Sequence, residues 1–139
     1  MTRLVYVDTG AWIGLLWARD RSHRGLARHF RSLREAGDLL VTSEAAIGET
    51  ATRLRYDAGL EAALAFHHYL QQAAAAGGLR IVETDGKLRV GAFEVMARHA
   101  DLVLSYADCL GVAVARRVGA KVVLGLDNDF RVLGFTLEP

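Results

Sequence analysis

The sequence predicts an α/β protein with three layers, in which a central parallel sheet of four to five strands lies between helices on both faces. Short apolar, β-branched runs alternate with longer segments of helical periodicity, as in proteins built from β–α–β units. Glycine residues mark most boundaries between these segments, and the only proline is Pro139, so no element is interrupted by proline. The length of 139 residues suits one domain, and we expect residues 1–139 to form a single one.

The expected strands are short and buried. The first is Arg3–Asp8, a β-branched run that ends in an acidic residue. The others are Asp38–Val41, Leu79–Val82, Lys121–Leu126 and a short fifth strand at Phe135–Leu137. In open parallel sheets, ligands bind beyond the carboxyl ends of the strands. The residues that follow the strands are therefore the first candidates for function.

Helices are expected between these strands. The clearest is Arg21–Ala36, where Leu26, Phe30 and Leu33 share one face and Gly37 ends the helix. The others are Ala11–Ala18, a helix from Ser43 to about Tyr56, Leu60–Ala76, Lys87–His99 and Tyr106–Val118. Ser43, Asp85 and Ser105 are the expected N-terminal caps.

Composition excludes several classes of protein. Apolar residues make up 52% and charged residues 24%, with a net charge of +1, so the chain is neither disordered nor strongly basic. The single cysteine, Cys109, excludes an internal disulfide and a cysteine-rich zinc module. The longest apolar stretch, Thr9–Ala18, falls short of the ~20 residues that span a bilayer, and Asp8 interrupts any signal sequence. We expect a cytoplasmic protein without a membrane partner.

Acidic residues are placed where such a sheet binds its ligand. Asp8 closes the first strand and Asp127 closes the fourth, while Glu49 and Asp108 lie near the starts of helices that follow the sheet. Asp129 is a fifth candidate. Carboxylates gathered in one pocket raise one another's pKa unless a cation holds them together. An all-oxygen site suits Mg²⁺ or Mn²⁺, as one or two ions, which can activate a water molecule for attack on a phosphate.

Each acid also has a structural interpretation. Ser105 and Asp108 fit a capping box, Asp127 and Asp129 fit a turn after a strand, and Glu49 fits a solvent-facing helix position. Asp8 is the hardest to explain in this way, because an apolar strand precedes it directly. The convergence of all these acids on one edge of the sheet favours a functional site.

Four motifs in order give the chain a resemblance to a known family. They are Val7–Trp12, Val41–Ser43 with Glu49–Thr50, Leu104–Asp108 with Ala115–Ala120, and Val123–Phe130. The chain resembles the PIN-domain ribonucleases, and most closely the VapC toxins of bacterial toxin–antitoxin pairs. This resemblance implies an endoribonuclease that depends on Mg²⁺ or Mn²⁺ and prefers single-stranded RNA. It also implies an antitoxin partner, a homodimer, and a metal site formed by Asp8, Glu49, Asp108 and Asp127.

Gly125 departs from the family pattern, which usually has threonine or serine at this position. A hydroxyl that would hold Asp127 is therefore missing, and Asp129 is a candidate to share its role. The alternative that follows is a PIN-like module with impaired catalysis that binds RNA or a partner protein.

A stripe of arginines is the remaining candidate for RNA binding. Arg21, Arg24, Arg28 and Arg31 are spaced by three or four residues, so they are expected on one face of their helix. Such a stripe can guide RNA phosphates, contact an acidic antitoxin, or form a solvated helix face.

Overall fold

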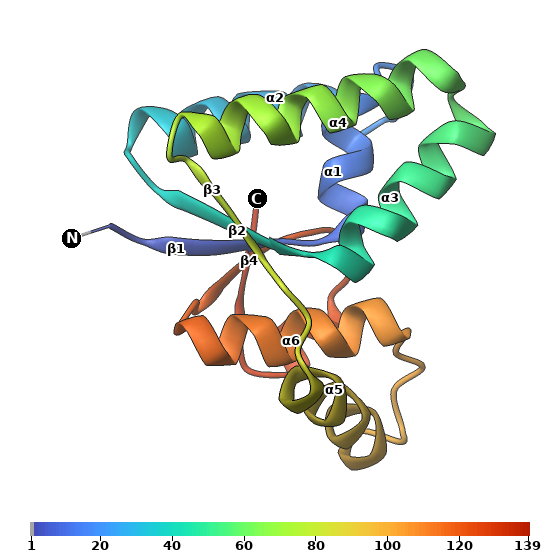
Figure 1. The fold of residues 1–139 in the computed structure, drawn as a ribbon, viewed down its shortest axis with the longest axis vertical. Coiled ribbons are helices and arrows are strands. Elements are labelled where there is room, and N and C mark those ends of the chain that lie inside the picture. Colours follow the sequence, from blue (N-terminus) through green and yellow to red (C-terminus); the bar gives the residue numbers. More distant parts are fainter. Residues whose placement is uncertain (1) are drawn as a thin grey trace.

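The computed structural model describes residues 2–139. Strands and helices alternate along the chain: β1 (Leu4–Val7), α1 (Thr9–Leu16), α2 (His23–Glu35), β2 (Leu39–Ser43), α3 (Glu44–Asp57), α4 (Leu60–Ala75), β3 (Leu79–Val82), α5 (Gly86–Arg98), α6 (Tyr106–Val118), β4 (Val122–Leu124), α7 (Asp129–Val132) and β5 (Thr136–Glu138). Helices α1–α4 cover one face of the sheet, and α5 and α6 cover the other (Figure 1). The predicted three-layer α/β/α fold is confirmed.

The sheet has five strands in the order β3-β2-β1-β4-β5, and all of them are parallel. The chain first adds β2 and β3 on one side of β1, and later adds β4 and β5 on the other. The strand order therefore reverses between β1 and β4. Such a switch point is where open α/β sheets form a crevice for ligands at the carboxyl ends of their strands.

Strand β1 divides the core into two halves because its side chains alternate between the two faces of the sheet. Val5 and Val7 pack with residues of α1, α2 and α4, whereas Tyr6 packs with residues of α5 and α6. The Tyr6 hydroxyl lies 2.9 Å from Ser43 Oγ, and Ser43 caps α3. A Cβ added to Gly111 would come within 2.7 Å of the Tyr6 ring, so glycine is required there. These contacts fix α3 and α6 against the sheet.

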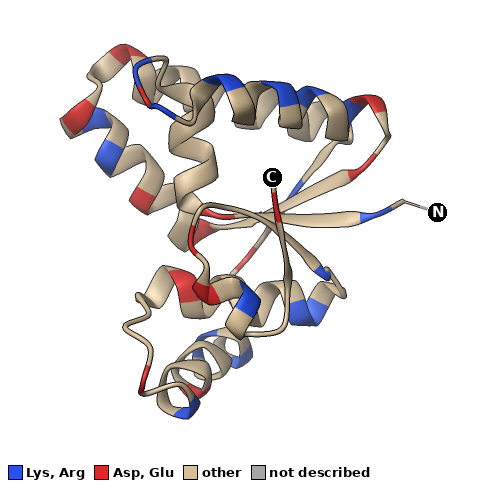
Figure 2. Ribbon diagram, turned by 180° about the vertical axis from the view of Figure 1, so that it is seen from behind, with Lys and Arg blue, Asp and Glu red and all other residues tan. Residues whose placement is uncertain are grey.

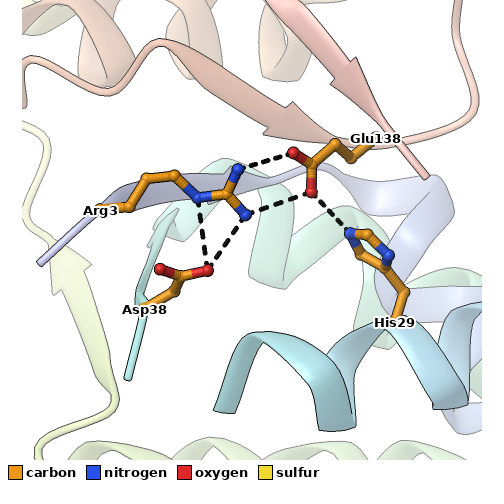
Figure 3. Close-up of polar contacts among 4 residues, drawn as sticks. All are labelled: Arg3, His29, Asp38 and Glu138. Carbon is orange, nitrogen blue, oxygen red and sulfur yellow. Dashed lines mark hydrogen bonds and ion pairs between the residues drawn. The ribbon is translucent and has the colours of Figure 1, made fainter. Parts of the chain in front are cut away.

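An ion cluster links Arg3 and Asp38, which precede β1 and β2, with Glu138 in the edge strand β5 and His29 in α2 (Figure 3). The Arg3 guanidinium lies between two carboxylates, with Nη1 2.8 Å from Glu138 Oε2 and Nη2 3.0 Å from Asp38 Oδ2. His29 Nε2 on α2 lies 2.7 Å from Glu138 Oε1. Burial alone would raise the pKa of Glu138, but the hydrogen bonds from Arg3 and His29 outweigh it and lower the pKa.

Replacing Glu138 with glutamine is expected to destabilise the fold at neutral pH by about 1 kcal/mol, because the ion pair with Arg3 is partly exposed. The lowered pKa means that this stabilisation is present above the unfolded pKa of about 4.5 and is lost as the pH falls through the folded value. Urea unfolding at pH 7 and pH 3.5 measures it. Glu35→Gln, at an exposed carboxylate without an ion pair among residues 2–139, is the control. Equal losses at pH 7 in both variants would contradict the assignment.

Several details differ from the sequence-based predictions; α1 lies at Thr9–Leu16 rather than Ala11–Ala18, and β2 ends at Ser43 rather than Val41. The helix expected to begin at Arg21 begins at His23, because the Asp20 carboxylate accepts a hydrogen bond from the Ser22 N–H and holds the preceding residues in a turn. Arg21 therefore precedes the helix that carries the other three arginines, and its predicted place on that face is wrong. The fourth strand ends at Leu124, and the unpredicted helix α7 begins at Asp129. Within residues 2–139, no helix combines the length and apolar character that crossing a membrane demands.

Candidate functional site

A pocket of about 390 Å³ lies at the carboxyl ends of β1 and β4, where the strand order reverses. Its lining consists of Asp8, Thr9, Gly10, Glu49, Arg53, Val103, Ser105, Asp108, Leu126 and Asp127. Four of the five predicted acids meet here, although they are up to 119 positions apart in the sequence (127 minus 8). Asp129 is outside this lining. Figure 2 shows acidic positions gathered beside the sheet between the two helical layers.

Asp8 is the most buried of these acids, with 6% of its surface exposed. Its Oδ1 atom is buried and has no hydrogen-bond partner among residues 2–139. Burial, followed by the negative charge of Asp108, raises the pKa of Asp8 to about 7, although a hydrogen bond from the Thr9 N–H opposes the rise. A buried carboxylate oxygen without a partner is costly, and a cation would remove that cost.

Thr9 places Glu49 in the pocket. Thr9 is the first residue of α1 and is nearly buried, and its hydroxyl donates a hydrogen bond of 3.1 Å to Glu49 Oε2. Glu49 lies in the second turn of α3, which begins where β2 ends. The two residues that follow β1 thus have separate roles: Asp8 supplies a carboxylate, and Thr9 orients the carboxylate of Glu49. Only one oxygen of Glu49 is occupied by this contact.

Asp108 caps α6 and also lines the pocket. The Ser105 N–H donates to Asp108 Oδ2 at 3.0 Å, and the Asp108 N–H donates to Ser105 Oγ at 3.0 Å, so the predicted capping box is present at the start of α6. The same carboxyl group lines the pocket. The capping box leaves Oδ1 free and fixes the side chain, so the structural role also orients Asp108.

Although Gly125 brings no hydroxyl to hold Asp127, a backbone contact holds the Asp127 side chain. Its Oδ1 accepts a hydrogen bond of 2.9 Å from the Asp129 backbone N–H. Asp129 thus contributes through its backbone. Gly125 has a steric role, because a Cβ added there would lie 3.3 Å from the Asp8 Cβ. The glycine allows the end of β4 to approach Asp8 closely.

The donor set fits a hard divalent cation. Four carboxylates line the pocket, one of them has an unpartnered buried oxygen, and the local contacts of Glu49, Asp108 and Asp127 each use one oxygen. As these side chains stand, no three Asp, Glu, His or Cys groups within residues 2–139 are close enough to hold one ion together. Mg²⁺ is commonly held by one or two carboxylates, with water and substrate phosphate as its other ligands. The arrangement suits that kind of site.

Sequence reasoning missed six of the ten residues that line the pocket. The residues not predicted as site residues are Thr9, Gly10, Arg53, Val103, Ser105 and Leu126. Arg53 could have been found from its spacing, because it follows Glu49 by four positions and so lies on the same side of α3. The three predicted arginines of α2, Arg24, Arg28 and Arg31, are exposed and do not line the pocket. Their role in RNA binding stays a prediction.

Comparison with known proteins agrees with this fold. The family model of the PIN domain matches residues 5–136. The chain belongs to the PIN-domain family.

Comparisons with individual proteins give more detail than the family model does. The chain is 31% identical over 136 residues to the "23S rRNA-specific endonuclease VapC20" of Mycobacterium tuberculosis, with 95% of each protein covered. A crystal structure of that VapC20, described as a sarcin-ricin loop cleaving toxin, superposes with a TM-score of 0.82 at 28% identity and covers 95% of this chain and 96% of the other. VapBC2 from Rickettsia felis, bound to a promoter DNA fragment, shares the fold with a TM-score of 0.68 at 14% identity, over 97% of each chain.

Proposed function

We propose that the protein is a Mg²⁺-dependent endoribonuclease and the toxin component of a toxin–antitoxin pair, with Mn²⁺ as an alternative metal. The observation that carries this proposal is the buried, unpartnered Oδ1 of Asp8 in a pocket with three further carboxylates at the switch point of the sheet. Such a site has an excess of negative charge, which a divalent cation can balance while it also binds a phosphate.

In this proposal, Asp8, Glu49, Asp108 and Asp127 hold one or two metal ions. When bound, the metal neutralises charge, activates water and stabilises the leaving oxygen of the phosphodiester. The protein holds the acceptor groups in place before the metal arrives: the Thr9 hydroxyl orients Glu49, and the Asp129 N–H orients Asp127. Asp8 is ionised above a pH of about 7 and is then ready to accept a cation. Asp129 acts through its backbone, and its carboxylate is a further candidate ligand.

The substrate is proposed from the relatives. Because the M. tuberculosis relative is named as specific for 23S rRNA, and its structure as cleaving the sarcin-ricin loop, ribosomal RNA of the large subunit is the first substrate to test. A cognate antitoxin and a homodimer are the proposed protein partners. The cytoplasm, where ribosomes are found, is the proposed location.

Purified protein incubated with 23S rRNA is expected to produce discrete fragments with Mg²⁺ and none with excess chelator. Asp108→Asn is expected to lower cleavage at least ~100-fold, because asparagine still accepts the Ser105 hydrogen bond but brings no charge to the metal. Asp101→Asn, at an exposed position in the preceding loop, is the control and should retain activity. Cleavage that persists in chelator would overturn the metal-dependent mechanism. Binding of RNA without cleavage would favour the impaired module.

A further inference from the structure

Arg53 is a cationic residue in the lining of the acidic pocket, and within that lining it stands alone. It follows Glu49 by four positions on α3, so both side chains leave the same side of the helix, one turn apart. The inner face of α3 carries Thr50 and Leu54, which are buried. Arg53 itself is exposed, so packing does not account for its presence beside the pocket.

Among the described residues, the Arg53 guanidinium forms no ion pair with the carboxylates around it. The ion pairs formed within residues 2–139 involve Arg3, His29 and Arg117, and Arg53 takes part in none of them. It also donates no side-chain hydrogen bond in that part of the chain, whereas Arg117 donates two to Asp85. All five of its N–H donors are therefore available to a ligand at the pocket.

Electrostatics indicates what that ligand is. A pocket with four carboxylates repels the phosphates of RNA, and a metal ion deep in the pocket reduces this repulsion only locally. A guanidinium at the wall attracts phosphate and binds two of its oxygens at once, which fixes the orientation of the group as well as its position. The arginines of α2 cannot do this from where they lie, because they are outside the pocket lining.

We propose that Arg53 binds a phosphate of the RNA strand next to the one that is cleaved, and thereby positions the substrate over the four carboxylates. This inference rests on the proposed function, since it takes RNA as the ligand. The chemical class of ligand is a phosphodiester of single-stranded nucleic acid. Arg53 touches no metal in this arrangement, so its loss should weaken RNA binding and leave metal binding intact.

The experiment compares Arg53→Gln and Arg53→Lys with Arg55→Gln as the matched control. Arg55 lies on the same helix, is exposed, has no ion pair among the described residues and does not line the pocket. The dissociation constant for a fluorescein-labelled single-stranded oligoribonucleotide is measured by anisotropy with Mg²⁺, in an Asp108→Asn background that keeps the RNA intact. Steady-state cleavage is measured in the wild-type background.

Arg53→Gln is expected to raise the dissociation constant about tenfold and to reduce the slope of log K against log salt by about 0.7, the value for one contact with a single strand. The Michaelis constant should rise with little change in kcat. Arg53→Lys should restore part of the affinity, because it keeps the charge and loses the two-point contact. Arg55→Gln should stay within twofold of the parent protein.

Equal effects of Arg53→Gln and Arg55→Gln on RNA affinity would overturn the assignment. A loss of Mg²⁺ affinity in Arg53→Gln, measured by calorimetry, would overturn it as well, because removing a nearby positive charge should not weaken the binding of a cation. If the wild-type protein does not cleave RNA, the proposed function fails, and the anisotropy comparison still decides whether Arg53 binds a phosphate.

Discussion

Replacing Asp8 with asparagine is expected to remove cleavage and, at the same time, to make the metal-free protein more stable. The folded state raises the pKa of this carboxyl group from 3.8 to about 7, so keeping it charged at pH 8 costs free energy that isosteric asparagine does not require. A shift of this size corresponds to a gain on the order of 4 kcal/mol, or roughly ten degrees in Tm. Cleavage should fall at least ~100-fold, because the unpartnered oxygen no longer carries charge.

The stability gain has a definite dependence on pH. Between pH 3.8 and about 7 the folded state binds a proton that the unfolded state has released, so the wild-type protein loses stability as the pH rises through this range. The difference between Asp8→Asn and wild type should therefore be largest above pH 7 and small near pH 4. Thermal unfolding in chelator at pH 4.5, 6 and 8 measures it, with Asp101→Asn as a control. A variant less stable than wild type at pH 8 would contradict the burial of charge at Asp8.

Binding of Mg²⁺ is the second prediction, and it too should depend strongly on pH. Protons compete with the metal for Asp8, so the apparent dissociation constant should rise towards tenfold for each pH unit below about 7 and level off above pH 8. Near pH 6 each binding event should release close to one proton. The reason is that an ion in the pocket needs the ionised form of Asp8.

Calorimetry at pH 5.5, 7 and 8.5, in pairs of buffers with different ionisation enthalpies, measures both the affinity and the proton release. Glu49→Gln is the informative comparison, because it removes a carboxylate from the pocket while Asp8 stays in its buried position. This variant should bind Mg²⁺ more weakly and keep the pH dependence, whereas Asp8→Asn should lose it. An affinity that is independent of pH in the wild-type protein would show that Asp8 is not a ligand.

The parts of the fold that the sequence predicts well are those with a local cause. The strand Leu79–Val82 and the helix Tyr106–Val118 were predicted with the bounds that the structure has. An apolar run indicates the strand, and capping residues mark both ends of the helix. Ser43, Asp85 and Ser105 cap their helices as expected. The position of Asp8 followed in the same way, since the β-branched run before it reads only as a buried strand.

The parts that the sequence does not predict depend on contacts between distant segments. Val103 is fully exposed at the pocket, and nothing in its neighbours indicates that it faces the acids of β1 and α3. The close approach of the end of β4 to Asp8 depends on Gly125, where an added Cβ would lie 3.3 Å from the Asp8 Cβ. Asp127 was expected directly after a strand, and it lies three residues beyond, on an exposed loop.

The strand order has a consequence for how the protein is made. Strand β1 is synthesised first, yet its neighbour β4 and the acid at position 127 are among the last parts to leave the ribosome. A nascent chain that has reached only α5 has Asp8 and Glu49 but neither Asp108 nor Asp127 opposite them. If the proposed nuclease activity requires all four, an unfinished chain is harmless, and a stop codon before residue 108 yields an inert product.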